Sequence, residues 1–317
     1  MELPPALQAA VTAVLDGVPL ADLTSAAETL SLRYRGEVRD GQAHLAQDMA
    51  AKAYLATRLP ATYAAILAVC DAVARSAPAI APRSHLDFGA GPGTAMWAAL
   101  HVWPGIEATE LVETSRAIRN LGESLAQAGA LSARWNSRGL KTAQAADIVT
   151  AGYVINEIDL AHRPGVIADL WTLTRAVLII VEPGTTAGWR RILAVRDQVL
   201  RLGGHILAPC PHAKACPLVE PDWCHFYARV ARSRLHRQAK GATVGWEDEK
   251  FHYLALSREP FATSWPRILS PPKVAKGNIQ FKLCRSDGAV ALRTVSKREG
   301  DLWRTARRLD WGDSGPV

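Results

Sequence analysis

The pattern of hydrophobic and polar positions changes near residue 80. Before that point apolar residues recur every three to four positions, as at Leu7, Val11 and Leu15, which is the period of an amphipathic helix. The alternation of apolar and polar residues that marks a strand does not occur there. We therefore predict a helical region over residues 1–80.

Short apolar runs alternate with helical patterns beyond residue 84. The strands predicted from these runs cover residues 85–88, 108–112, 147–151 and 176–181, and the helices between them include 116–130 and 164–174. Strands that alternate with helices form a parallel sheet covered on both faces, which binds ligands at the carboxyl ends of its strands. Two further strands, at 251–256 and 278–283, are expected to complete this sheet.

The expected organisation has four parts. They are a helical N-terminal region (1–80), an α/β sheet domain (81–200 and 245–296), a cysteine-rich insertion (201–244) and a basic C-terminal tail (297–317).

The composition is that of a globular protein. Hydrophobic residues make up 49% of the 317 residues and charged residues 21%, far from the composition of disordered chains. No apolar run is long enough to span a bilayer, and the N-terminus lacks the features of a signal peptide or transit peptide. We therefore expect a cytoplasmic protein with no membrane partner, whose thiols stay reduced.

Basic residues are concentrated in the last third of the chain, and the whole chain has a net charge of +7. Such patches usually neutralise phosphates, and the alternative is a solvated arginine-rich surface. Residues 229, 232, 236 and 240 recur at helical spacing, which predicts a basic stripe along one helical face. The candidate RNA-binding residues are Arg229, Arg232, Arg237, Lys240, Arg307 and Arg308.

A glycine-rich segment follows the first predicted strand and reads Asp-Phe-Gly-Ala-Gly-Pro-Gly at 87–93. The dinucleotide fingerprint needs its third glycine one position later than here. Asp-x-Gly-x-Gly-x-Gly is the pattern of class I S-adenosylmethionine-dependent methyltransferases, and the alternative is a tight turn without a ligand. Glu113 follows the second strand, where ribose hydroxyls are bound in such folds. The candidate cofactor-binding residues are Asp87, Gly89, Gly91, Gly93 and Glu113.

The segment after the predicted strand at residues 147–151 carries the candidate catalytic residues. Amino-group methyltransferases commonly have Asn/Asp-Pro-Pro-aromatic at this point, whereas residues 154–158 read Val-Ile-Asn-Glu-Ile. Asn156 and Glu157 could orient a substrate, but the prolines and the aromatic residue are missing. Cys210, preceded by proline, superficially resembles the nucleophile of cytosine methyltransferases. That chemistry needs a free thiolate, which a metal-bound cysteine cannot supply.

Four of the five cysteines are candidate metal ligands: Cys210, Cys216, Cys224 and Cys284. Structural zinc sites usually use Cys-x-x-Cys pairs, and none occurs here. Gaps of six and eight residues between the first three cysteines suit a loop that wraps a four-iron cluster. The alternatives are a zinc site that uses three cysteines with His212 or His225, and unrelated buried cysteines.

Together these motifs resemble the methyltransferase-like small-ribosomal-subunit assembly factors of the Rsm22 type, found in mitochondria and some bacteria. The matching blocks are residues 86–93, 153–157, 181–185, 210–212, 216–217, 223–226, 249–253, 306–308 and 311–313. The resemblance implies a class I methyltransferase core, S-adenosylmethionine as a cofactor and binding to small-subunit ribosomal RNA during assembly. It also implies a four-iron–four-sulfur (4Fe–4S) cluster on the four cysteines named above.

Two functions follow from this resemblance. One is a binding protein that assists assembly of the small subunit, which the missing catalytic motif favours. The other is an active S-adenosylmethionine-dependent rRNA methyltransferase. We expect a monomer and, because no mitochondrial presequence is apparent, a bacterial member of the family.

Overall fold

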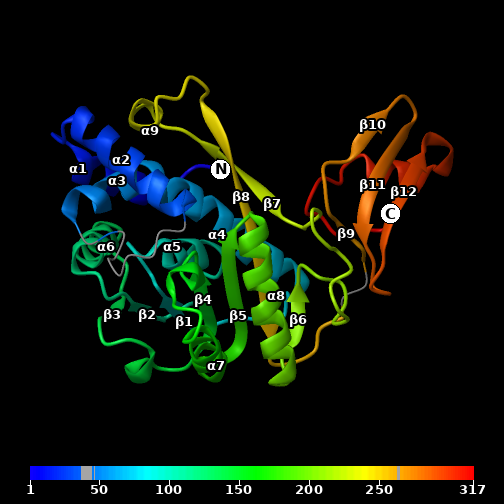
Figure 1. Ribbon diagram of the computed structural model, residues 1–317, viewed down its shortest axis with the longest axis horizontal. Coiled ribbons are helices and arrows are strands. Elements are labelled where there is room, and N and C mark those ends of the chain that lie inside the picture. Colours follow the sequence, from blue (N-terminus) through cyan, green and yellow to red (C-terminus); the bar gives the residue numbers. More distant parts are fainter. Residues whose placement is uncertain (37–44, 46, 263–264) are drawn as a thin grey trace.

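The computed structural model describes residues 1–36, 45, 47–262 and 265–317. A large mixed sheet has helices on both faces, and the C-terminal residues form a smaller sheet beside it (Figure 1).

The N-terminal region is helical, as predicted. Its helices are α1 (Pro5–Leu15), α2 (Leu20–Arg35), α3 (Asp48–Thr57) and α4 (Leu59–Ser76). The apolar stripe Leu7, Val11 and Leu15 is buried in the core that these helices share with the sheet. Among the described residues no single helix is long and apolar enough to cross a membrane; only the bent pairs α1–α2 and α3–α4 reach that length and composition together.

The large sheet has the strand order β3-β2-β1-β4-β5-β8-β6, with β7 paired to β8. Its strands are β1 (Ser84–Phe88), β2 (Ala108–Val112), β3 (Arg134–Asn136), β4 (Ala146–Gly152), β5 (Thr174–Pro183), β6 (His205–Ala208), β7 (Phe226–Ala231) and β8 (Trp246–Ser257). Strands β1 to β5 are parallel, and β8 runs antiparallel to β5, β6 and β7. This order is that of a Rossmann-like methyltransferase fold, in which an antiparallel strand lies beside the fifth strand.

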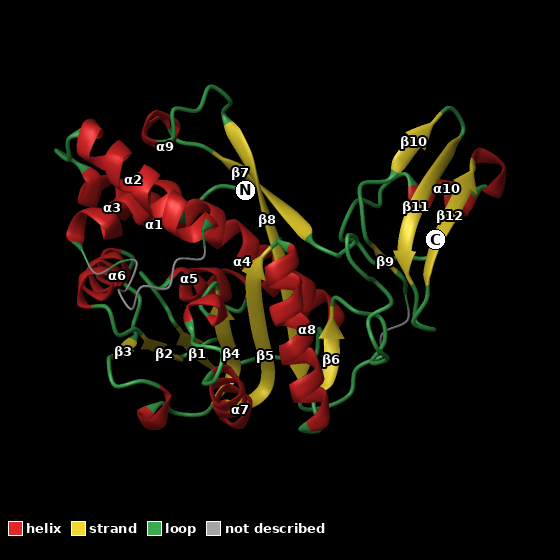
Figure 2. Ribbon diagram, in the orientation of Figure 1, coloured by secondary structure: helices red, strands yellow, loops and turns green. Residues whose placement is uncertain are grey.

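Helices cover both faces of this sheet (Figure 2). They are α4, α5 (Thr94–Val102) and α6 (Arg116–Ala128) on one face, and α7 (Arg163–Leu173) and α8 (Thr186–Arg201) on the other. Alternate residues of β5 enter the two cores: Val177 and Ile179 on the first side, Leu178 and Ile180 on the second. Because both faces are buried, this strand is a continuous apolar run that the sequence pattern could identify.

The prediction that residues 278–283 belong to the large sheet is wrong. They form β11 (Asn278–Cys284), which lies in a second sheet with β9 (Arg267–Ile268), β10 (Lys273–Ala275) and β12 (Val290–Ser296). The methyltransferase-like sheet therefore ends at Ser257 rather than at residue 296. The residues of β11 alternate between polar and apolar, which is typical of an antiparallel sheet covered on one face. Helix α10 (Asp301–Ala306) contributes Ala306 to the small core on that face.

The segment predicted as a cysteine-rich insertion adds strands to the large sheet. It contains β6, β7 and the short helix α9 (Arg234–Ala239), and the β7–β8 hairpin carries α9 above the sheet, next to α2 and α3 (Figure 1).

The predicted basic stripe on one helix is also wrong. Arg229 lies on β7 and Arg232 in the following loop, because residues 226–231 pair with β8.

Candidate functional site

A cavity of about 610 Å³ lies at the carboxyl ends of the central strands. Five of the predicted site residues line it: Gly89, Gly91, Glu113, Asn156 and Glu157. Helices α2, α3 and α4 contribute the rest of one wall, so the N-terminal region covers the strand ends. The volume is in the range of about 300–1,000 Å³ that is usual for small-molecule sites.

The glycine loop lies against the segment that follows β4. Gly89 has φ +68°, and a Cβ added to it would lie 2.7 Å from Val154 Cβ. The backbone N–H of Gly91 donates a hydrogen bond of 2.9 Å to Glu113 Oε2, and Ser115 N–H donates one of 2.7 Å to Glu113 Oε1. Burial raises the pKa of Glu113. The carboxylate therefore fixes the loop and lines the cavity.

Asp87 and Gly93, the other two predicted cofactor residues, do not line the cavity. Asp87 is buried between strands, and its Oδ1 accepts a 2.6 Å hydrogen bond from Thr150 Oγ1. Burial raises the pKa of Asp87 to about 7. Gly93 precedes α5 at φ +81° and packs near Met96 and Leu111. Both residues shape the loop, and neither lines the cavity.

A polar group that the sequence did not indicate lines the opposite wall. The Tyr153 hydroxyl donates a 3.1 Å hydrogen bond to Glu249 Oε1, and the Arg58 guanidinium lies 3.4 Å from the same oxygen. Arg58 also lies over the ring of Tyr34, 5.7 Å from its centroid. Glu249 falls within the block 249–253 that carries the family resemblance, whereas Arg58 and Tyr34 belong to no motif.

The candidate catalytic residues lie on a 3₁₀ turn, Ile155–Glu157, at the floor of the cavity. Asn156 Oδ1 is buried and has no hydrogen-bond partner within the described chain. Burial, reinforced by the nearby Glu113 carboxylate, raises the pKa of Glu157 to about 7. A buried amide oxygen without a partner is a polar group available to a ligand.

A second, much smaller cavity of about 20 Å³ is lined by all four predicted cysteine ligands. Its lining includes Cys210, Cys216 and Cys224, which lie between β6 and β7, and Cys284 at the end of β11. None of these thiols forms a disulfide. The described residues nevertheless include no group of three or more His, Cys, Asp or Glu side chains that could hold a metal ion as they stand. The cavity joins this segment to β11 of the second sheet through Cys284, and Phe226 of β7 in the large sheet also lines it.

Two histidines contact the cysteines. His212 Nε2 lies 3.4 Å from Cys284 Sγ, and His252 Nε2 on β8 lies 3.3 Å from Cys224 Sγ. The sequence analysis considered His212 but not His252, whose position on β8 brings it to the thiol. His225, the other predicted histidine, packs between Trp223 and Trp311.

The cysteine cavity also contains buried positive charge. Arg196 on α8 has only 2% of its surface exposed, lines this cavity beside Cys210, and donates hydrogen bonds to the backbone oxygens of His212 and Lys214. Its only carboxylate partner in the described structure is Asp197, at 3.4 Å, whose side chain is 58% exposed. Burial raises the pKa of Cys210 and Cys224, and that of Cys284 to about 12. A buried guanidinium with so weak a counter-charge is costly unless an anion lies beside it.

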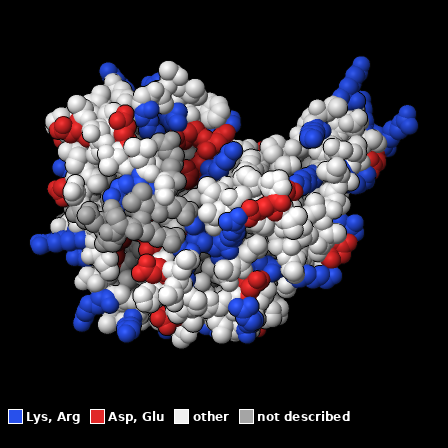
Figure 3. Space-filling view, viewed as in Figure 1, with Lys and Arg blue, Asp and Glu red and all other residues white. Residues whose placement is uncertain are grey.

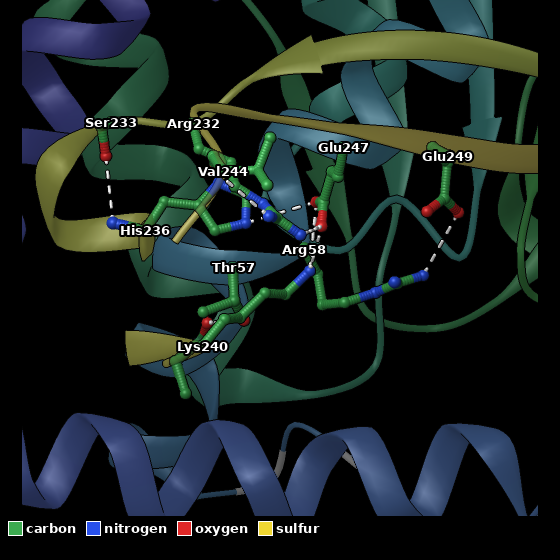
Figure 4. A network of polar contacts seen from close by, with 10 residues as sticks. Thr57, Arg58, Arg232, Ser233, His236, Lys240, Val244, Glu247 and Glu249 are labelled. Carbon is green, nitrogen blue, oxygen red and sulfur yellow. Dashed lines mark hydrogen bonds and ion pairs between the residues drawn. The ribbon is translucent and has the colours of Figure 1, made fainter. Parts of the chain in front are cut away.

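Several predicted RNA-binding residues are already paired with carboxylates of β8. Arg229 makes two hydrogen bonds to Asp248, of 2.8 and 3.0 Å. Glu247 forms ion pairs with Arg232, at 2.7 Å, and with Lys240, at 2.8 Å (Figure 4).

Glu247 is also 3.3 Å from His236, so three basic side chains surround it (Figure 4). Burial alone would raise the pKa of Glu247, but hydrogen bonds from these side chains hold it below its usual range. This network fixes α9 to the hairpin.

Exposed basic side chains are found instead around the second sheet. Arg307 and Arg308 are exposed and make no ion pair with any described residue. Figure 3 shows lysine and arginine side chains over this part of the molecule. The exposed residues of this group without an ion-pair partner in the described structure are Lys273, Lys276, Lys297, Arg298, Arg307 and Arg308.

Comparison with known proteins agrees with the resemblance seen in the motifs. The chain is 30% identical over 287 residues to the human ribosome assembly protein METTL17, mitochondrial, covering 83% of this chain and 62% of that protein. It is 24% identical to the Rsm22-cox11 tandem protein 2, mitochondrial, of Schizosaccharomyces pombe, covering 84% of this chain and 43% of that protein. The chain thus spans less than two thirds of the length of either relative.

Solved structures are more distant. An O-methyltransferase family protein from Burkholderia thailandensis is 14% identical with a TM-score of 0.45, covering 76% of this chain and 71% of its own. The magnesium protoporphyrin IX methyltransferase of Synechocystis PCC 6803 with bound SAM is 13% identical with a TM-score of 0.43, covering 77% and 100%. The model of the family described as "Mitochondrial small ribosomal subunit Rsm22" matches residues 48–316. The chain therefore belongs to the Rsm22 family.

Proposed function

We propose that this protein is a methyltransferase-like factor that binds small-subunit ribosomal RNA and assists assembly of the small ribosomal subunit, as a monomer in the cytoplasm. It binds S-adenosylmethionine in the larger cavity and holds a 4Fe–4S cluster on the four cysteines that line the smaller one. The observation that carries the proposal is the convergence of Cys210, Cys216, Cys224 and Cys284 on one cavity.

The larger cavity supports the cofactor assignment. Gly89 and Gly91 provide backbone that a ligand can approach closely, and Glu113 provides a carboxylate for ribose hydroxyls. The strand order places all three at the carboxyl ends of β1 and β2, where nucleotides bind in folds of this type.

The donor set of the smaller cavity fits a cluster better than a single zinc ion. Four thiolates are the usual ligands of a 4Fe–4S centre. Such a centre is anionic overall, so it would add a buried counter-charge for Arg196, whose carboxylate partner Asp197 is largely exposed. A cavity of about 20 Å³ has room for about one water, so the cysteine side chains must turn outward on loading. Cys210, Cys216 and Cys224 lie outside regular elements, where such movement is easiest. A Cys₃His zinc site using His212 is the alternative.

The cluster has a structural role in this proposal. Cys284 belongs to the second sheet and the other three cysteines to the segment between β6 and β7. One inorganic core would join these parts and hold the exposed basic residues of the second sheet in a fixed position for RNA. The names of both relatives, which refer to ribosome assembly and to Rsm22, support this partner.

Metal analysis tests the proposal directly. Protein purified without oxygen is expected to contain about four iron and four sulfide per chain and to absorb near 400 nm. Cys216→Ser is expected to lose the iron, unfold the β6–β7 segment and weaken binding to small-subunit RNA, whereas Cys70→Ser, at a buried thiol on α4, is expected to change none of these. Zinc in place of iron would support the Cys₃His alternative, and full RNA affinity without a cluster would exclude the structural role.

A second candidate function is methyl transfer to rRNA, which the unpartnered Asn156 Oδ1 in the cavity favours. Bound S-adenosylmethionine would supply the methyl group, and Asn156 with Glu157 would orient the acceptor. Transfer of tritium from labelled cofactor to immature small subunits tests it. Label at background, with cofactor binding confirmed by calorimetry, would leave the assembly function alone.

A further inference from the structure

We infer that Arg58 and Glu249 form a subsite for the amino-acid end of the cofactor, in which the guanidinium binds the α-carboxylate and the Glu249 carboxylate binds the α-ammonium. This inference rests on the proposed cofactor site and adds a residue from the N-terminal helical region to it.

A short chain of contacts connects the glycine loop to this pair. Gly89 packs under Val154, and the preceding residue, Tyr153, donates its hydroxyl to Glu249. Glu249 in turn is the ion-pair partner of Arg58. Every one of these residues lines the same cavity. Adenosine bound at Glu113 and the glycine loop would therefore direct its 5′ substituent toward the pair.

The pair has unused hydrogen-bonding capacity. A guanidinium has five N–H donors, and among the described residues Arg58 uses one side-chain donor, to Glu249 Oε1. Glu249 Oε2 accepts no hydrogen bond from the described residues. The two charged groups thus face the cavity with free donors and a free acceptor.

The arrangement matches a zwitterion in its charges. An amino-acid group presents a carboxylate and an ammonium on one carbon, so it can bind an arginine and a glutamate that lie side by side. Lys250 also lines the cavity but is exposed, whereas the Arg58 and Glu249 side chains are 26% and 13% exposed. Charge-assisted hydrogen bonds are stronger at the less solvated pair.

A neighbouring glutamate on the same strand has a different role. Glu247, two residues before Glu249, is surrounded by Arg232, His236 and Lys240. Arg58 is the one basic side chain that Figure 4 shows bonded to Glu249, whose Oε1 also accepts the Tyr153 hydroxyl. Glu247 is therefore saturated by the protein. Glu249 is the carboxylate of this strand that remains available to a ligand.

Calorimetry with two probes tests the subsite. S-Adenosylhomocysteine carries the amino-acid group, and 5′-methylthioadenosine has the same adenosine and thioether without it. The wild-type protein is expected to bind the first about 10- to 100-fold more tightly, the range for one or two charge-assisted hydrogen bonds. Arg58→Met is expected to remove most of this preference while leaving 5′-methylthioadenosine affinity within about twofold. Arg83→Met, at an arginine paired with Glu107 on the exposed surface, is the matched control and should keep the preference.

The outcomes separate the two proposals. If the wild-type protein binds neither probe, the proposed cofactor site fails. If it binds both with equal affinity, or if Arg58→Met weakens both to the same extent, the pair only joins α4 to β8 and the inference is overturned. If Arg58→Met does not fold, the double variant Arg58→Met/Glu249→Gln is measured instead, because it leaves no unpaired buried charge. If that variant retains the preference for S-adenosylhomocysteine, the inference is also overturned.

Discussion

His252 lies 3.3 Å from Cys224, three positions after Glu249, which lines the larger cavity. Both residues belong to β8, which crosses the sheet beside β5 and continues above its carboxyl edge. One strand therefore contacts Cys224 with one residue and lines the larger cavity with another. The two candidate sites share a structural element, although their residues are far apart in sequence.

The cavity lined by cysteines leads to a prediction about Cys284, which is the most distant of the four in sequence. Cys284→Ser should reduce the bound iron to a small fraction of the wild-type content, because a 4Fe–4S cluster needs all four thiolates in this site. Anaerobic iron and sulfide analysis measures this, with Cys70→Ser as the buried-thiol control. Full iron content in Cys284→Ser would show that the second sheet supplies no ligand.

The glycine loop leads to a second prediction. In Gly89→Ala the new methyl group would meet Val154 at a position with φ +68°, so the free energy of unfolding should fall by about 2–5 kcal/mol. Gly91→Ala has φ +54° but open space around the added carbon, so only the backbone strain of about 1–2 kcal/mol is expected. Urea denaturation compares the two variants. Equal losses would mean that contact with Val154 adds nothing to the strain.

Local patterns were sufficient for the central strands and for the cysteines. Residues 108–112 and 176–181 are compact apolar runs, and both are strands of the large sheet. Three of the five cysteines lie within fifteen residues, and this clustering indicated a shared site. Together with Cys284 they line one cavity.

Assignments that depend on long-range partners could not be made in the same way. The alternation in β11 indicates a strand but does not say which sheet it joins. Arg58 and Glu249 meet only because a helix end and a hairpin are folded over the same strand ends, and neither residue lies in a motif for charge pairs. The sequence gives the charge of Arg229, but the pairing of this residue with Asp248 could not be predicted from it.

The buried Asp87 predicts a pH dependence. Its pKa of about 7 in the folded protein is above the ordinary value, so the folded state holds a proton that the unfolded chain releases between about pH 4 and pH 7. The corresponding stabilisation is complete below about pH 4 and is lost as the pH rises through 7.

Asp87→Asn cannot titrate and keeps an acceptor for Thr150. The wild-type protein should therefore lose stability relative to Asp87→Asn between pH 5 and pH 8, by on the order of 2–4 kcal/mol. Thermal unfolding at several pH values measures the difference, and Glu28→Gln, at an exposed position of α2, is the control. A difference that does not change with pH would show that Asp87 is ionised in the folded protein throughout this range.

The pairing of the arginines predicts which of them contact RNA. Arg307 and Arg308 are exposed and make no ion pair with any described residue, whereas Arg229 is held by two hydrogen bonds to Asp248. An arginine that must first leave a carboxylate gains less from a phosphate than one that is solvated. Arg307→Ala/Arg308→Ala should therefore weaken binding to a small-subunit RNA transcript by about tenfold and reduce the slope of log K against log salt by about 1–2.

Arg229→Ala is the matched comparison, because it removes the same type of charge from the β7–β8 hairpin. It should change the RNA affinity by less than about twofold, since its guanidinium is already neutralised. Fluorescence anisotropy at several salt concentrations gives both the affinity and the slope. If Arg229→Ala weakened binding as much as the double substitution, the RNA would have to displace Asp248, and the hairpin rather than the second sheet would be the main contact. The acidic residues of β8 would then act as competitors for phosphate, and Asp248→Asn should strengthen binding.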